Sequence, residues 1–274
     1  MALKISLAGD LGSGKSTVSN ILMGELGAEY YGTGKIAREL AESMGMDIAA
    51  LNIYMEDHPE MDYEFDRRLV NLSDDPRTLI IDSRMAWHFT RGTLKIYLST
   101  DPETSAVRIM RAGRSSEQFA TVEEAAERIR ARKESERKRY GELYGVDCKD
   151  LGNYNLVIDT TYASPEETCE AILATIPAWE ADSEVRACYV CPRRLRYPDD
   201  APDAEAVARI SSAVERGEDT PPVEVCYRDD TFYVMGGAEV ALAYALCEAP
   251  LVPCRLVDGS PDPTAFVKME DNLS

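Results

Sequence analysis

The chain has 274 residues, which at roughly 150 residues per domain predicts two domains. Hydrophobic residues make up 45% of it, enough for ordinary globular cores and too many for a disordered chain. The 49 acidic side chains outnumber the 30 basic ones, and the net charge of −19 argues against holding nucleic acid by bulk charge. An acidic surface of this kind is typical of a soluble cytoplasmic protein.

The N-terminal residues predict neither a signal peptide nor a membrane anchor. Residues 4–8 lead directly into a glycine loop, and no apolar run approaches the roughly 18 residues of a membrane span. The seven cysteines are odd in number and unevenly spaced, so we expect reduced thiols. Cys188 and Cys191 form a single C-x-x-C pair whose members point to opposite faces of an extended strand, which argues against a zinc or redox site.

The first half of the chain alternates strand-like and helix-like segments. Strands are expected at residues 4–8, 78–82, 94–98 and 156–159. Helices are expected at residues 16–26, 34–44, 47–57, 59–72, 102–112, 122–143 and 165–176. This alternation predicts an α/β fold over residues 1–178, with a parallel sheet covered by helices on both faces.

Residues 177–184 break this rhythm and are the expected linker to a smaller α+β domain over residues 185–258. Its expected strands are residues 187–190, 223–227, 231–235 and 252–257, and its expected helices are residues 203–216 and 237–247. Residues 259–274 are polar and contain two prolines, so we expect a loosely ordered tail.

A glycine-rich loop follows the first expected strand and opens the first expected helix. Residues 9–16 read GDLGSGKS, which fits the phosphate-loop pattern G-x-x-x-x-G-K-[ST]. Its backbone amides and the helix N-terminus favour a bound phosphate. We expect Lys15 to bridge the β- and γ-phosphates of ATP and Ser16 to bind Mg²⁺. The residues expected to bind the nucleotide are Gly9, Gly12, Ser13, Gly14, Lys15, Ser16 and Thr17.

Four further segments carry a family resemblance. They are residues 32–40 (GTGKIAREL), 57–68 (DHPEMDYEFDRR), 79–87 (LIIDSRMAW) and 132–147 (RKESERKRYGELYGVD). With the phosphate loop, they make residues 3–176 resemble the short, archaeal-type cytidylate kinases, a branch of the nucleoside monophosphate kinases. On a helix, Arg132, Glu136 and Arg139 share one face, where two guanidiniums and a carboxylate can grip a monophosphate and a base edge. A solvated face of ion pairs is the alternative for that helix.

The resemblance implies a site for ATP, Mg²⁺ and a nucleoside monophosphate. The residues that would hold the acceptor phosphate are Arg38, Arg84, Arg132 and Arg139. Glu136 would lie near the base, and Thr33 would approach the acceptor. Asp82 would order Mg²⁺-bound water or the acceptor, with a cap at the strand end as its alternative role.

Arg108, Arg111 and Arg114 lie where a mobile lid is expected to begin. Arg114 would join Lys15 in stabilising the transferring phosphoryl group, although plain surface arginines are the alternative. Lys15, Arg114 and Asp82 are therefore the expected catalytic residues. The two histidines, His58 and His88, are too few and too scattered for a metal cluster.

Three residues are unusual: Asp10 in the phosphate loop, and Lys35 and Ala37, which depart from the family pattern. Asp10 is unusual because a carboxylate in a phosphate loop weakens phosphate binding unless it points away, and we interpret it as a solvent-facing loop residue. Lys35 and Ala37 stand where the family usually has an acidic and an aromatic residue. They leave the base and sugar preference of the acceptor open.

Two segments of the second half, residues 232–244 (FYVMGGAEVALAY) and 252–257 (VPCRLV), make residues 187–257 resemble the sulfiredoxin/ParB-like fold. In that fold two glycines precede a polar set at a helix start, which binds phosphate or does chemistry. Here Ala238, Glu239 and Val240 occupy those positions. We therefore expect a domain that keeps the fold, has lost its catalysis, and serves partner binding, dimerisation or regulation.

The sequence thus predicts an ATP-dependent kinase that phosphorylates CMP or dCMP, by positioning and charge stabilisation rather than acid–base chemistry. A kinase of the same fold with another small acceptor is one alternative. An ATP-binding regulatory module with little turnover is the other. The expected partners are the nucleotide substrate and, through the second domain, a protein or a second copy of the chain, but neither nucleic acid nor a membrane.

Overall fold

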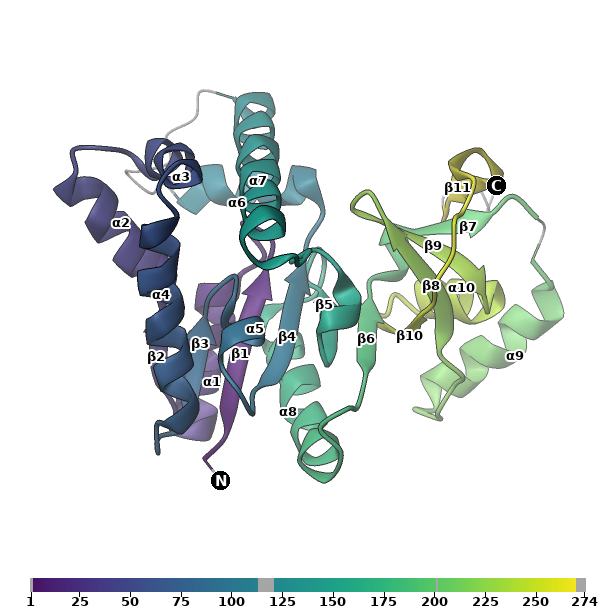
Figure 1. Ribbon diagram of the computed structural model, residues 1–274. Coiled ribbons are helices and arrows are strands. Elements are labelled where there is room, and N and C mark those ends of the chain that lie inside the picture. Colours follow the sequence, from purple (N-terminus) through teal and green to yellow (C-terminus); the bar gives the residue numbers. More distant parts are fainter. Residues whose placement is uncertain (1, 113–120, 201, 270–274) are drawn as a thin grey trace.

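In residues 2–112, 121–200 and 202–269, which the computed structural model describes, eleven strands form one continuous sheet. Its strand order is β11-β7-β9-β8-β10-β6-β5-β4-β1-β3-β2 (Figure 1). Within these residues, no helix is long and apolar enough to cross a membrane.

The N-terminal half of the sheet is parallel. Its strands are β1 (Lys4–Gly9), β2 (Glu29–Gly32), β3 (Leu79–Asp82), β4 (Leu94–Ser99) and β5 (Leu156–Asp159). The carboxyl ends of parallel strands meet at one edge, where α/β proteins bind their ligands. That edge here holds the glycine loop and Asp82, as the sequence predicts.

Helices cover both faces of this half. α1 (Lys15–Leu26) and α8 (Pro165–Ala181) pack together on one face, over a core that contains Leu7, Leu22 and Ile172. α4 (Pro59–Asn71) and α5 (Ala86–Phe89) lie on the other face. The remaining helices, at the carboxyl edge of the strands, are α2 (Thr33–Ser43), α3 (Ile48–Glu56), α6 (Pro102–Ala112) and α7 (Val122–Tyr144) (Figure 1). The predicted α/β class is confirmed.

The C-terminal half extends the same sheet. Its strands are β6 (Ala187–Val190), β7 (Leu195–Pro198), β8 (Val223–Arg228), β9 (Thr231–Gly236), β10 (Val252–Leu256) and β11 (Phe266–Lys268). β6 pairs parallel to β5 and antiparallel to β10, so it joins the two halves. Two helices, α9 (Ala204–Glu215) and α10 (Ala238–Leu246), pack against each other beside these strands.

Two expectations about the chain's segments are wrong. The expected linker begins inside α8, which continues through Pro177 to Ala181 because Trp179 packs on the core beneath it. The tail is not loosely ordered at residues 266–268, because β11 pairs with β7. The strands β2 and β7 and the short helix α5 were not expected from the sequence.

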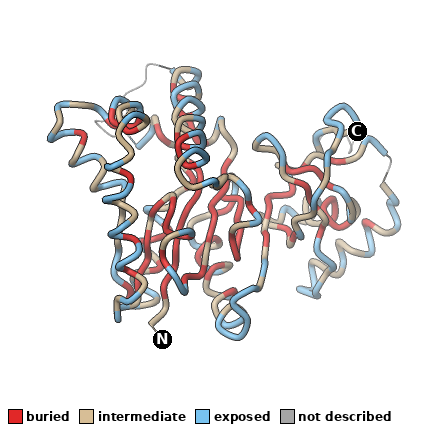
Figure 2. The backbone as a smooth tube through the Cα atoms, in the orientation of Figure 1, coloured by how far each residue is buried: buried red, intermediate tan, exposed pale blue. Residues whose placement is uncertain are grey.

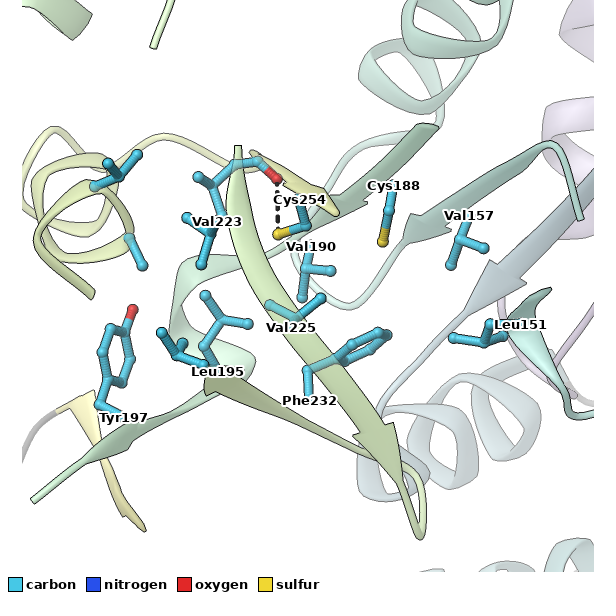
Figure 3. Close-up of a cluster of buried hydrophobic side chains, with 14 of the residues drawn as sticks. Leu151, Val157, Cys188, Val190, Leu195, Tyr197, Val223, Val225, Phe232 and Cys254 are labelled. Atoms are coloured by element: carbon cyan, nitrogen blue, oxygen red, sulfur yellow. Dashed lines mark hydrogen bonds between the residues drawn. The ribbon is translucent and has the colours of Figure 1, made fainter. Parts of the chain in front are cut away.

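The hydrophobic core also crosses the predicted domain boundary. Leu151, Val157 and Tyr154 from the first half share a buried cluster with Val225 and Phe232 from the second (Figure 3). Buried backbone likewise runs through the strands of both halves (Figure 2). All seven cysteines are free, and Cys188 and Cys191 are buried.

A shared core predicts that the two halves unfold together. Phe232 is fully buried, so Phe232→Ala is expected to lower the free energy of unfolding by about 3–5 kcal/mol. Trp87 lies in the shared cluster, whereas Trp179 packs on the cluster around Leu22. In urea titrations, the unfolding transition followed by tryptophan fluorescence is expected to coincide with the transition followed by circular dichroism. Two separate transitions in the variant, with the first half intact, contradict the shared core.

Candidate active site

The glycine loop connects β1 to α1 in a conformation that requires glycine. Gly12 and Gly14 have φ angles of 74° and 83°, in the left-handed region. A Cβ on Gly9 would lie 2.3 Å from the carbonyl oxygen of Leu98 on β4. The loop therefore packs tightly on the sheet and ends at the N-terminus of α1, where a helix favours an anion.

Lys15, the first residue of α1, folds back over this loop. Its Nζ donates to the carbonyl oxygens of Gly9 at 3.0 Å and Asp10 at 2.6 Å. Burial, helped by the Arg84 guanidinium, lowers the pKa of Lys15 to about 7. Phosphate oxygens would offer this ammonium a charged partner in place of the two carbonyls.

Beside the loop lies a cavity of about 580 Å³, within the usual range for small-molecule sites. It extends from the glycine loop to helices α2, α3, α4 and α7. Most of the expected site residues line it: Gly12, Ser13, Gly14, Lys15, Ser16, Thr17, Thr33, Arg38, Asp82, Arg84, Arg132, Glu136 and Arg139. Gly9 lies behind the loop, Arg111 is exposed and outside the cavity lining, and Arg114 lies outside the described residues.

Glu136 on α7 holds two of these arginines. Its carboxylate lies 2.9 Å from Nε of Arg84 and 2.9 Å from Nε of Arg132. Burial opposes its ionisation, but the two guanidiniums lower the pKa of Glu136 to about 2. Arg84 also donates to the Gly9 carbonyl, so one guanidinium links the phosphate loop to α7. Arg38 lines the same cavity without an ion-pair partner among the described residues.

Arg139 takes a different position from that expected beside Glu136. Its Nη1 donates to the Asn52 carbonyl at 3.0 Å, and its Nε lies 3.2 Å from Oδ2 of Asp62 on α4. Burial raises the pKa of Asp62 to about 6 against the opposing effect of Arg139. Asn52 and Asp62 were missed from the sequence, although Asp62 belongs to the acidic segment at residues 57–68.

Asp82 lies at the end of β3 and lines the same cavity. Its Oδ2 accepts a hydrogen bond from the Tyr30 hydroxyl at 2.9 Å, and Thr33 Oγ1 lies 3.4 Å from its carbonyl oxygen. Tyr30 is a further cavity residue that the sequence analysis missed. The sequence offers little indication of Tyr30, because β2, the strand that carries it, has no buried apolar run and was not expected.

Arg108 bridges the loop and the strand end beside it. Its guanidinium donates to the carbonyls of Gly12, Thr160 and Thr161, and burial lowers its pKa. It therefore braces one side of the cavity at the start of the expected lid region.

The expectation that Asp10 faces solvent is wrong. Asp10 is 1% exposed and lies outside the cavity lining. Its carboxylate accepts hydrogen bonds from the Tyr97 hydroxyl and the Thr100 amide, both at 3.0 Å. Burial opposes its ionisation, yet Lys149 and Lys133 hold the pKa of Asp10 well below its usual range. The carboxylate points away from the phosphate side, which removes the objection to an acid in this loop.

A glycine loop between a buried strand and a helix, opening on an arginine-lined cavity, defines a P-loop nucleotide-binding protein. The chain belongs to the cytidylate kinase-like family, whose sequence model matches residues 4–162.

Several archaeal proteins are similar to this chain. The cytidylate kinase of Thermoplasma volcanium is 35% identical over 178 residues, covering 64% of this chain and 91% of that protein. The cytidylate kinase of Sulfolobus acidocaldarius is 37% identical over 176 residues, covering 64% and 94%. These relatives are therefore matched almost throughout, while about a third of this chain lies outside the match.

Similarity to solved structures is lower. An uncharacterized protein from Eubacterium ventriosum is 16% identical, with a TM-score of 0.47, and covers 64% of this chain and 99% of that chain. Sulfiredoxin from Arabidopsis thaliana is 18% identical, with a TM-score of 0.25, and covers 27% of this chain and 85% of that chain. Neither score supports a structural argument, so the sulfiredoxin/ParB-like resemblance of the second half stays a prediction.

The lowered pKa of Lys15 makes nucleotide binding dependent on protons. Bound phosphates are expected to raise this pKa, so Lys15 is mostly neutral in the free protein at pH 8 and charged in the complex. Titration calorimetry at pH 8 in buffers of different ionisation enthalpy is expected to show uptake of nearly one proton per ATP bound. At pH 6 Lys15 is already charged and contributes no uptake. Release of protons at pH 8, or no proton uptake there, contradicts this role of Lys15.

Proposed function

We propose that this chain transfers the γ-phosphoryl group of ATP to CMP or dCMP, forming the nucleoside diphosphate. The observation that carries the proposal is the single cavity that joins the phosphate loop to the arginines around Glu136. A donor site and an acceptor site that share one cavity support direct transfer between two bound nucleotides. Membership of the cytidylate kinase-like family supports the choice of acceptor.

On the donor side, the loop backbone from Gly12 to Thr17 would hold the ATP phosphates. Lys15 would contact the β- and γ-phosphates and stabilise the negative charge on the transferring phosphoryl group. The residues present fit Mg²⁺, because Ser16 and Asp82, which carry the oxygen donors that Mg²⁺ prefers, line the same cavity. When bound, Mg²⁺ supplies charge neutralisation on the phosphate oxygens.

On the acceptor side, Arg38, Arg84 and Arg132 would bind the monophosphate. Glu136 holds Arg84 and Arg132 by charge-assisted contacts, which fixes their positions before the substrate arrives. Fixed donors of this kind cost little reorganisation during transfer. Thr33 would contact the acceptor from α2.

The deep end of the cavity would receive the base. Arg139 and Asp62 place a guanidinium and a carboxylate close together there, beside the backbone carbonyl of Asn52, and such groups pair with the donors and acceptors of a base edge. Polar groups fixed in this way discriminate strongly between bases. No side chain needs to act as a nucleophile or a general base in this reaction.

The proposed activity predicts acceptor-dependent turnover. ADP release from ATP and Mg²⁺ is expected to be fast with CMP or dCMP, and slow with UMP, AMP or no acceptor. Lys15→Ala is expected to abolish it, since the transferring group loses its fixed cation. Turnover with a different small acceptor favours a kinase of the same fold that acts on that acceptor. ATP binding without turnover on any acceptor favours a regulatory module.

The placement of Arg132 predicts a selective loss of acceptor binding. Arg132→Ala is expected to raise KM for CMP about tenfold or more, the usual cost of a charged hydrogen bond, with less effect on KM for ATP. Arg128→Ala is a matched control, because it removes an exposed arginine from the same helix. Steady-state kinetics with either substrate varied separates the two effects. Equal KM values for CMP in the two variants exclude Arg132 from the acceptor site.

A further inference from the structure

The buried carboxylate of Asp10 is a structural part of the phosphate loop. Lys15 and Ser13 both donate to the Asp10 carbonyl, at 2.6 Å and 2.8 Å, so the backbone here is part of the phosphate-binding loop itself. The side chain of the same residue points into a separate cluster of charges behind the loop. One residue therefore connects the loop backbone to that cluster.

Two lysines hold the Asp10 carboxylate. Nζ of Lys149 lies 2.6 Å from Oδ1 and Nζ of Lys133 lies 3.0 Å from the same oxygen. Lys133 is on α7, next to Arg132, which lines the acceptor side of the cavity. The cluster thus connects the donor loop with the helix that carries the acceptor arginines.

The same lysines are shared by Asp230, which comes from the second half of the chain. Its carboxylate lies 3.1 Å from Nζ of Lys149 and 3.5 Å from Nζ of Lys133. Asp230 occupies the turn between β8 and β9 with a φ angle of 57°. The Tyr227 hydroxyl donates to its Oδ1 at 2.8 Å, and Arg194 donates to its carbonyl oxygen at 2.8 Å.

The cluster is balanced in charge, with two carboxylates and two ammonium groups that are largely buried. Removing the Asp230 charge leaves one ammonium uncompensated in a poorly hydrated region. A buried charge without its partner is costly, so one lysine would leave the cluster for water, and Asp10 would lose one of the two ammonium groups that hold it. The family model matches residues 4–162, so Asp230 and the turn that carries it lie outside the matched segment.

We propose that Asp230 is a positioning residue for the phosphate loop, through which the β8–β9 turn of the C-terminal half keeps the ATP site in its binding geometry. Asp230 acts through Lys149, Lys133 and Asp10 and does not touch the nucleotide. The C-terminal half is therefore a component of the donor site rather than an independent attachment. The proposal rests on the part of the proposed function that concerns ATP binding, and not on the identity of the acceptor.

The test compares Asp230→Asn with Asp229→Asn. Both remove one negative charge from the same turn, but the Asp229 side chain is exposed and outside the cluster. Asp230→Asn is expected to raise the ATP dissociation constant, measured by calorimetry without acceptor, about tenfold, equivalent to 1.4 kcal/mol. Asp229→Asn is expected to leave it within about twofold, the size of an exposed charge effect.

The sign of the change separates positioning from simple electrostatics. Loss of a negative charge near the loop attracts ATP more strongly if the loop geometry is unchanged, so it lowers the dissociation constant. Unchanged or tighter ATP binding by Asp230→Asn therefore overturns the proposal. In steady-state kinetics the change is expected in KM for ATP more than in kcat, as for an interaction made equally in ground and transition states.

Two further variants keep the test decisive if Asp230→Asn fails to fold. Tyr227→Phe removes only the hydrogen bond to the Asp230 carboxylate and is expected to weaken ATP binding about threefold, a smaller effect than that of Asp230→Asn because Asp230 keeps its two lysine partners. The double variant Asp230→Asn with Lys149→Gln restores the charge balance and is expected to recover part of the affinity. Normal ATP binding by Tyr227→Phe, or a double variant weaker than the sum of its single changes, contradicts the proposal.

The readouts also separate this proposal from the proposed function. If no acceptor supports turnover but ATP binding responds to Asp230→Asn as described, the positioning role stands and the kinase assignment fails. If CMP is phosphorylated and Asp230→Asn leaves the ATP dissociation constant unchanged, the kinase assignment stands and the positioning role fails. Lys15→Ala serves in both cases as the variant that lacks the phosphate-loop cation.

Discussion

A site for two nucleotides must keep cations buried before any phosphate arrives, and this constraint organises the whole molecule. Unpaired buried charge is expensive, so the buried cations here have partners that phosphate can replace or supplement. Glu136 holds Arg84 and Arg132, Asp62 lies against Arg139, and backbone carbonyls hold Lys15. A chain of net charge −19 thereby concentrates positive charge where it is needed while its surface stays acidic.

The parts of the site that depend on local sequence were predictable. The glycines of the loop at residues 9–16 have fixed positions, because the backbone takes left-handed φ angles just before the helix begins. Arg132 and Glu136 were placed on one face by helical periodicity alone. Arg139 lies on the same face, yet Asp62 on a distant helix determines what it contacts. Periodicity cannot predict such a partner, because the packing of α4 against α3 and α7 is a property of the tertiary fold.

The fold shows the same division. Apolar runs such as residues 79–82 and 156–159 predicted the buried parallel strands almost to the residue. Strand β2, with exposed or partly exposed residues, lacked that signal. The boundary near residue 180 was predicted from a break in the alternation of strands and helices, but that alternation does not determine which strands pair. β6 pairs with β5 because the buried Asp159 at the strand end forms an ion pair with Arg194, and because Val157 has core partners beyond β6.

This continuity changes how the second half should be regarded. An appended domain joined by a flexible linker can influence a kinase only through occasional contacts or through local concentration. A domain that shares the sheet, the core and a buried charge cluster shifts the active site whenever its own conformation shifts, because packed cores and interfaces switch between discrete arrangements. The Arg194–Asp159 pair lies at the end of β5, and Lys149 of the Lys149–Asp230 pair also contacts Asp10 of the phosphate loop. A ligand or partner that binds the C-terminal half therefore has a physical route to the ATP site, and by reciprocity ATP has the same route back.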